Sequence, residues 1–103
     1  MRNSSVTSAA NATAVVTIAG ITGQQVRLYR VDGYTSAGTS GLTITDGGTT
    51  IYQSPATLLS SSAFTAISWT QPLAANPGNT MVITASAAGV GNTVTINVEA
   101  DDF

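Results

Sequence analysis

Residues 42–53 read LTITDGGTTIYQ, two runs rich in β-branched residues on either side of the pair Gly47-Gly48. Both glycines can adopt the positive φ angles that a tight primed turn requires. The sequence therefore predicts a β-hairpin here. The apolar residues that we expect on its inner face are Leu42, Ile44 and Ile51.

The same two-residue alternation recurs along the chain, most clearly in TVTINVEA, residues 93–100, where Val94, Ile96 and Val98 share one face. A period of two indicates strands with one buried face. Further strands are expected at 12–19, 25–34, 63–71 and 80–87, and the strand at 80–87 is expected to form a second hairpin with the final strand. About seven to eight short strands, separated by turns, predict an all-β fold, an antiparallel β-sandwich or a small barrel.

The strand at residues 25–34, QVRLYRVDGY, changes phase in its middle. Val26 and Leu28 share one face, whereas Tyr29 and Val31 share the other. Such a change predicts a β-bulge or burial on both sides of the strand.

The length of 103 residues suits a single domain, which we expect at residues 12–103. Residues 1–11, rich in Ser, Asn and Ala, are expected to form a flexible N-terminal arm. Because the chain has no cysteine, its fold must depend on packing and hydrogen bonds.

Charge is scarce: only 8% of the residues are charged, none is lysine, and the net charge is −2. Soluble proteins typically have about a quarter of their residues charged. A surface of Thr, Ser and Asn offers little electrostatic resistance to self-association, so we expect a homo-oligomer. With three basic residues, the chain has no stripe that could neutralise phosphates, and we expect no nucleic-acid partner.

Reactive side chains are also scarce, since histidine, cysteine and lysine are all missing. A general base near neutral pH and a thiolate or amine nucleophile are therefore not available. The acidic residues Asp32, Asp46 and Glu99 are better explained as turn or strand-end residues than as a glycosidase pair or calcium ligands. We expect no enzyme activity, no metal and no cofactor.

Trp69 and the hydropathy of the chain bear on binding to sugars and to membranes. Trp69 could stack against a sugar ring, but on a strand opposite Phe64 it is expected in the core. No apolar run reaches the roughly 18 residues that span a bilayer, and the N-terminal residues lack the apolar centre of a signal peptide. We therefore expect no membrane partner and synthesis in the cytoplasm without an export signal.

Two quoted stretches together resemble a known group of proteins. They are GQQVRLYRVDGYTSAGTSGLTITDGGTTIYQ, residues 23–53, and PLAANPGNTMVITASAAGVGNTVTINVEA, residues 72–100. Their order, with a glycine-flanked LTI-DG-TTI hairpin, a PL-to-PGN loop and a closing Ala/Gly hairpin, is similar to small uncharacterised proteins of tailed bacteriophages. The similarity extends roughly from Val15 to Val98.

The resemblance implies a virion structural protein with a jelly-roll-like sandwich, similar to capsid decoration or cement proteins. Such a protein would bind the outside of the phage head, with the major capsid protein as partner, and bridge capsomers as a homo-oligomer, for which we expect a trimer. Alternatives are a tail, fibre or head-spike module and a carbohydrate-binding adhesion module of the particle. The residues expected to contact the capsid or another protomer are Arg2, Asn3, Ser4, Ser5 and Phe103.

Overall fold

The computed structural model describes residues 2–61 and 65–103, which form β-strands and no helix, so no helix among them could span a membrane. The strands are β1 (Arg2–Thr7), β2 (Ala14–Ile18), β3 (Val26–Thr35), β4 (Thr39–Ser40), β5 (Leu42–Asp46), β6 (Thr49–Gln53), β7 (Leu59–Ser60), β8 (Thr65–Ala74), β9 (Met81–Ala85) and β10 (Val94–Asp102).

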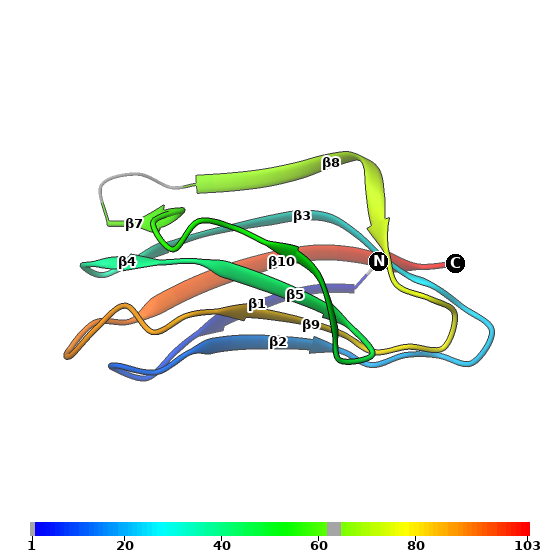
Figure 1. The fold of residues 1–103 in the computed structure, drawn as a ribbon, viewed down its shortest axis with the longest axis horizontal. Helices are drawn as coiled ribbons and strands as arrows, with labels where there is room; N and C mark the ends of the chain where they lie inside the picture. The colour runs from blue at the N-terminus through cyan, green and yellow to red at the C-terminus, as the bar shows by residue number, and fades with distance from the viewer. Residues whose placement is uncertain (1, 62–64) are drawn as a thin grey trace.

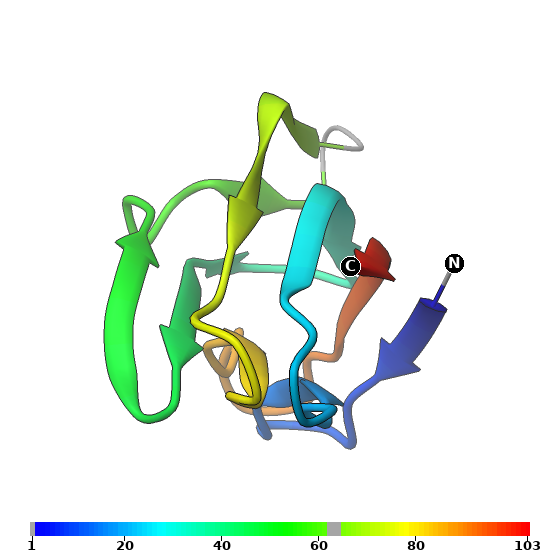
Figure 2. The ribbon, with the colours of Figure 1, turned by 90° about the vertical axis from the view of Figure 1, so that its right-hand side faces the viewer.

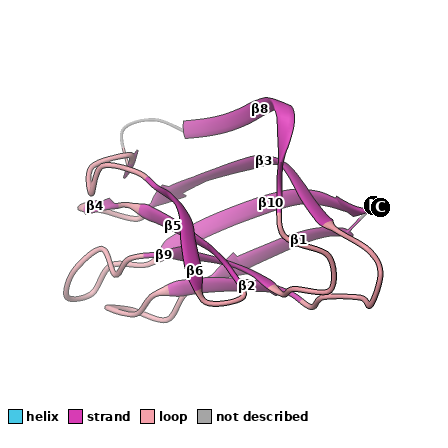
Figure 3. Ribbon diagram, turned by 45° about the vertical axis from the view of Figure 1, so that its right-hand side comes forward, coloured by secondary structure: helices cyan, strands magenta, loops and turns pink. Residues whose placement is uncertain are grey.

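Eight of the strands form two four-stranded antiparallel sheets. Sheet A has the order β1-β10-β3-β8 and sheet B the order β2-β9-β5-β6. The two-residue strands β4 and β7 pair with each other as a small ribbon at one end (Figure 1). The predicted antiparallel β-sandwich is confirmed (Figure 3).

Consecutive strands of these two sheets alternate between them, and the hairpin β5–β6 is the one connection that stays within a sheet. The predicted second hairpin, between residues 80–87 and 93–100, is therefore wrong. Strand β9 pairs with β2 and β5 in sheet B, whereas β10 pairs with β1 and β3 in sheet A. Residues 86–93 connect β9 in sheet B to β10 in sheet A. Both strands therefore bury their apolar side chains in the same interior, between the sheets.

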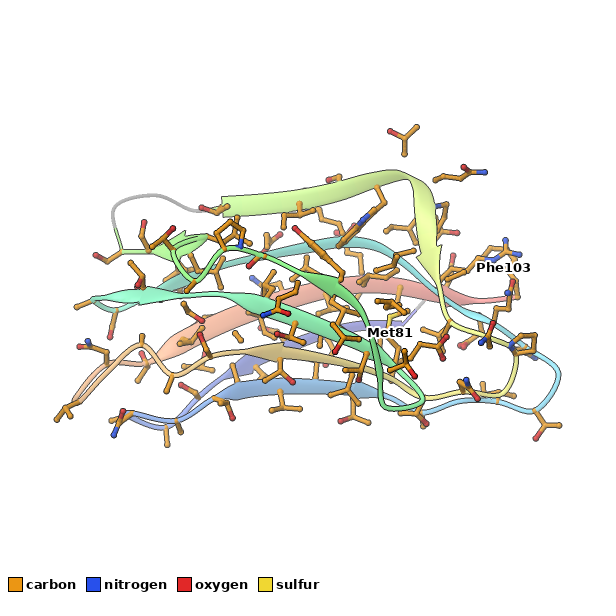
Figure 4. The ribbon with its side chains drawn as sticks, in the orientation of Figure 1. Met81 and Phe103 are labelled. Carbon is orange, nitrogen blue, oxygen red and sulfur yellow. The ribbon has the colours of Figure 1, made fainter. Side chains whose placement is uncertain are left out.

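The core fills the space between the inner faces of the sheets. Ile44 and Ile83 of sheet B and Leu28 and Ile96 of sheet A are all completely buried. Met81 also lies between the sheets, at the end of the molecule nearer to Phe103 (Figure 4). Burial alternates along β2 and β9, so the two-residue period of apolar residues in the sequence corresponds to one inner and one outer face of each strand.

The phase change in β3 is a bulge, as predicted. The registers of β3 with β8 and with β10 both shift next to Tyr29. The extra residue brings Val31 back to the inner face, where it is buried with Val26 and Leu28. The expectation that Val31 lies on the opposite face is wrong, because the bulge absorbs one residue of the alternation.

The hairpin of residues 42–53 forms as predicted, with positive φ angles of 55° at Gly47 and 90° at Gly48. Leu42 and Ile44 are buried on its inner side. Ile51 is only partly buried, because the register with β5 shifts between Ile44 and Thr45 and leaves Ile51 at a bulge.

Residues 2–7, expected in an N-terminal arm, form β1 and pair with β10 along their whole length. Just after β1, two hydrogen bonds join Ser8 to Val94. The Ser8 N–H donates to the Val94 carbonyl, and the Val94 N–H donates to the Ser8 Oγ. The structure thus includes this segment in sheet A, where its backbone groups satisfy the outer edge of β10.

We expect Ile83→Ala to lower the free energy of unfolding by about 2–5 kcal/mol, because it removes buried methyl groups and leaves a cavity in the centre of the core. Thr84→Ala is the matched control, since its side chain lies on the outer face of the same strand and should change stability by less than about 1 kcal/mol. Urea unfolding followed by circular dichroism measures both. Equal effects of the two substitutions would contradict this assignment of faces.

Candidate functional site

The outer face of sheet A carries most of the charge of the molecule. Five of the eight charged residues alternate outward along β3 and β10. We call this surface the charged face and define it by Arg27, Arg30, Asp32, Glu99 and Asp101. The Arg30 Nε lies 3.2 Å from the Asp32 Oδ2 but without hydrogen-bond geometry, so the two groups interact as an ion pair.

A row of hydrogen bonds crosses the charged face over three strands. The Ser5 Oγ of β1 donates to the Asn97 Oδ1 of β10 at 2.6 Å, and the Asn97 Nδ2 donates to the Asp32 Oδ1 of β3 at 2.7 Å. Next to it, the hydroxyl groups of Thr7 and Thr95 lie 3.0 Å apart. Because these side chains bond one another, the row joins β1 to the centre of sheet A.

The outer face of sheet B is different, because it carries no charged side chain. The register places Val15, Thr84, Thr43 and Gln53 side by side in one row across the four strands. The adjacent row consists of Thr17, Val82, Thr45 and Thr50. We call these eight residues the neutral face. Val15 has 42% of its surface exposed, so part of this face is apolar and open to solvent.

The predicted contact residues fall into two groups on sheet A. Asn3, Ser4 and Ser5 are exposed on β1 and, with Asn97 and Glu99 of β10, border a shallow hollow of about 320 Å³. The backbone of Arg2 pairs with that of Ala100 at the end of this edge. None of these residues lies on the neutral face, and their role in contact with the capsid or another protomer stays a prediction.

Phe103 lies at the far end of β10, where it extends the pairing with β3. Its N–H donates to the Gln25 carbonyl at 3.0 Å, and its carbonyl accepts from the Gln25 N–H at 2.7 Å. The guanidinium carbon of Arg27 lies 4.2 Å from the centroid of its ring, a cation–π contact. Phe103 remains 54% exposed, so this contact leaves much of the ring available (Figure 4).

Asp46, the acidic residue of the hairpin corner, bonds to a neighbouring loop. One carboxylate oxygen accepts from the Asn76 N–H at 3.0 Å and the other from the Asn79 Nδ2 at 2.8 Å. Asn76 and Asn79 flank Pro77 and Gly78. The φ of 82° at Gly78 fits a type II turn. The hairpin therefore holds the loop between β8 and β9 in place, and Asp46 has a structural role.

Trp69 is partly buried and packs against the core. Its ring meets that of Tyr52 edge to face, with centroids 5.5 Å apart and planes at 89°. Its remaining surface borders a hollow of about 460 Å³ next to Gln25, Arg27 and Gln71. The hollow forms where β8 bulges away from β3, since four residues, 69–72, stand opposite Tyr29 alone.

The chemistry available at these surfaces is that of binding. Within residues 2–61 and 65–103, no group of three His, Cys, Asp or Glu side chains lies close enough to hold a metal ion. Five of the eight charged side chains are spread over the charged face, and Asp46 is engaged within the chain. The arrangement offers two outer faces of contrasting polarity.

Comparison with protein-family models, with curated proteins and with solved structures found no match.

Sequence reasoning missed the neutral face. Its signal is present in the sequence, because no charged residue occurs between Asp46 and Glu99. Alternation alone, however, does not say which strands share a sheet. The register was needed to show that the outward residues of β2, β9, β5 and β6 form one continuous surface.

We expect Asn97→Ala to lower the free energy of unfolding by about 1–3 kcal/mol, because it removes two hydrogen bonds and leaves the Asp32 carboxylate without one partner. The amide protons of β1 should exchange faster with solvent, since Asn97 ties β1 to the sheet. Asn3→Ala, an exposed position on the same face, is the control and should change neither quantity. Unaltered hydrogen exchange in β1 of the Asn97→Ala protein would refute this role for the row.

Proposed function

We propose that this protein is a non-enzymatic virion structural protein that decorates the outside of a bacteriophage head. It binds the major capsid protein and stabilises the shell by bridging capsomers. The proposal rests on the resemblance to small proteins of tailed bacteriophages and on one structural observation, the contrast between the two outer faces of the sandwich.

The neutral face carries the argument. Interfaces are depleted of charged residues at their centres, because a charge buried there without a partner loses its hydration. Four strands of sheet B present threonine, valine and glutamine with no charged side chain among them. This composition supports docking of sheet B onto the shell, with the charged face of sheet A directed to solvent.

The strand order supports a jelly-roll description of the sandwich. Along the chain, consecutive strands of the two sheets alternate between them except for the hairpin β5–β6, with β1-β10-β3-β8 facing β2-β9-β5-β6. Jelly rolls contain eight strands in two such sheets and are common in viral capsid domains. Because one fold serves many functions, the strand order is an analogy that adds to the surface argument.

Multivalency provides the mechanism. A rigid body with several modest contacts binds more tightly than any single contact, because the first contact raises the effective concentration of the rest. A homo-oligomer, for which we expect a trimer, would present several neutral faces to neighbouring capsomers. No reactive group is needed for this task, and Asp46 and the hairpin serve to keep the body rigid.

The location on the particle separates this proposal from its alternatives. A tail, fibre or spike module would contact tail components and occur in far fewer copies than a protein that covers the head. A carbohydrate-binding module would use the hollow beside Trp69, whose glutamine and arginine side chains could bond to hydroxyl groups. The packing of Trp69 against Tyr52 and the core disfavours that use, because it reduces the ring surface that a sugar could contact.

We expect Thr17→Lys to weaken binding to capsids by at least about 30-fold, because the ammonium group would be placed in an uncharged interface without a partner. The matched control is Thr22→Lys, the same substitution in the exposed turn between β2 and β3. Co-sedimentation of each variant with capsids assembled without this protein measures the affinity.

The two variants give opposite results if sheet B faces the shell. Undiminished binding of Thr17→Lys would contradict docking through the neutral face. An equal loss with Thr22→Lys would show that the added charge acts at a distance and would also contradict it.

A further inference from the structure

The side of the sandwich on which β6 and β8 form the sheet edges is apolar and incompletely buried. Seven partly buried hydrophobic side chains pack against the core, and six of them come from β6, from β8 or from the segment between them. We call this surface the open side and define it by Ile51, Tyr52, Leu58, Ile67, Trp69 and Leu73. No residue of β6 or β8 is fully buried in the single chain.

The open side results from the way in which the two sheets meet. On the opposite side of the sandwich, β1 and β2 lie in contact and close the interior. Figure 2 shows β6 and β8 set apart, at the left and at the top of that view. Tyr52 and Trp69 span the space between these strands by their edge-to-face contact. The sandwich is thus closed along β1 and β2 and widens toward β6 and β8.

Strand β8 is also a sheet edge, and part of it is unprotected. It is ten residues long and pairs with β3 on one side in sheet A. Monomeric β-proteins protect such edges with charged residues, prolines, bulges or short strands. The bulge and Pro72 protect residues 69–72, but residues 65–68 pair regularly with β3 and carry no charge. Their outer backbone groups can therefore pair with another chain.

The lack of charge on the open side favours a second copy of this chain as its partner. The sequence has no charged residue between Asp46 and Glu99, a span that includes all of β6 and β8. A strongly basic partner would find no complementary charge here, and a strongly acidic one would find only Arg27, at the rim of the hollow beside Trp69. A second copy presents an equally uncharged apolar surface, so the two can meet without burying an unpaired charge.

We propose that the open side is the interface through which copies of this chain associate. Ile67 and Trp69 of each copy are the central contacts, and residues 65–68 supply the edge that meets the neighbouring chain. The open side would form the homo-oligomer that is part of the proposed function. Only the role of that oligomer, bridging capsomers, rests on the proposed function. Self-association is measured on the free protein and shell binding on capsids, so either proposal can fail without the other.

Analytical ultracentrifugation of the free protein tests the association. We expect a mass of at least twice the 10.4 kDa of one chain at micromolar concentration. Trp69 is the only tryptophan, so its fluorescence reports on the open side alone. Its emission should shift to longer wavelength on dilution, in step with the fall in mass, as water reaches the ring.

Two substitutions on different strands probe the interface. Ile67→Lys on β8 and Ile51→Lys on β6 should each raise the dissociation constant by at least about 30-fold, because each places a charge in the apolar contact. Both sites are partly exposed in the single chain, and circular dichroism checks that each variant is folded. Thr17→Lys on the neutral face is the control and should leave the mass unchanged.

Three results would overturn the proposal. One is a mass of 10.4 kDa at about 100-fold higher concentration with constant Trp69 emission. Another is an unchanged mass of the folded Ile67→Lys and Ile51→Lys variants. The third is a Trp69 emission that responds to added glycans and not to protein concentration, since a sugar would then occupy this side.

Discussion

The contact between the inner faces of the two sheets is the interaction on which the whole structure depends. The chain has no cysteine, so no disulfide assists this contact. Completely buried aliphatic side chains of β3 and β10 meet those of β5 and β9, the central strands of their sheets. Because every second residue of these strands is used in the core, the residues between them are free to give each outer face its own chemistry. The functional surfaces are a consequence of this alternation.

Three surfaces of different polarity surround this core. Sheet A presents charges and a row of hydrogen bonds, sheet B presents uncharged threonine and valine, and the open side presents partly buried aliphatic and aromatic groups. In the proposed arrangement, sheet B lies on the shell and the open side meets neighbouring copies, while sheet A faces the solvent. Each surface thereby has a separate task, and a rigid sandwich holds the three at constant angles.

Local features were predictable from sequence, whereas the pairing of strands was not. The hairpin at Gly47-Gly48 and the Pro77-Gly78 turn follow from local backbone requirements. The association of β10 with β1 and β3 depends on residues far away in the chain, and the alternation in β9 and β10 fits either sheet equally well. Strand β1 carries little apolar signal, since Val6 is its one hydrophobic residue and its backbone makes the pairing. The neutral face required the register, which local patterns do not contain.

The location of the protein on virus particles tests the central claim most directly. Under the proposal, a tailed bacteriophage encodes this chain. Purified particles of that phage would be imaged by cryo-electron microscopy, and the protein would be quantified against the major shell protein. The account predicts many copies at regular positions over the head, with sheet B against the shell and sheet A outward. Copies confined to the tail, or a head without this protein, would contradict it.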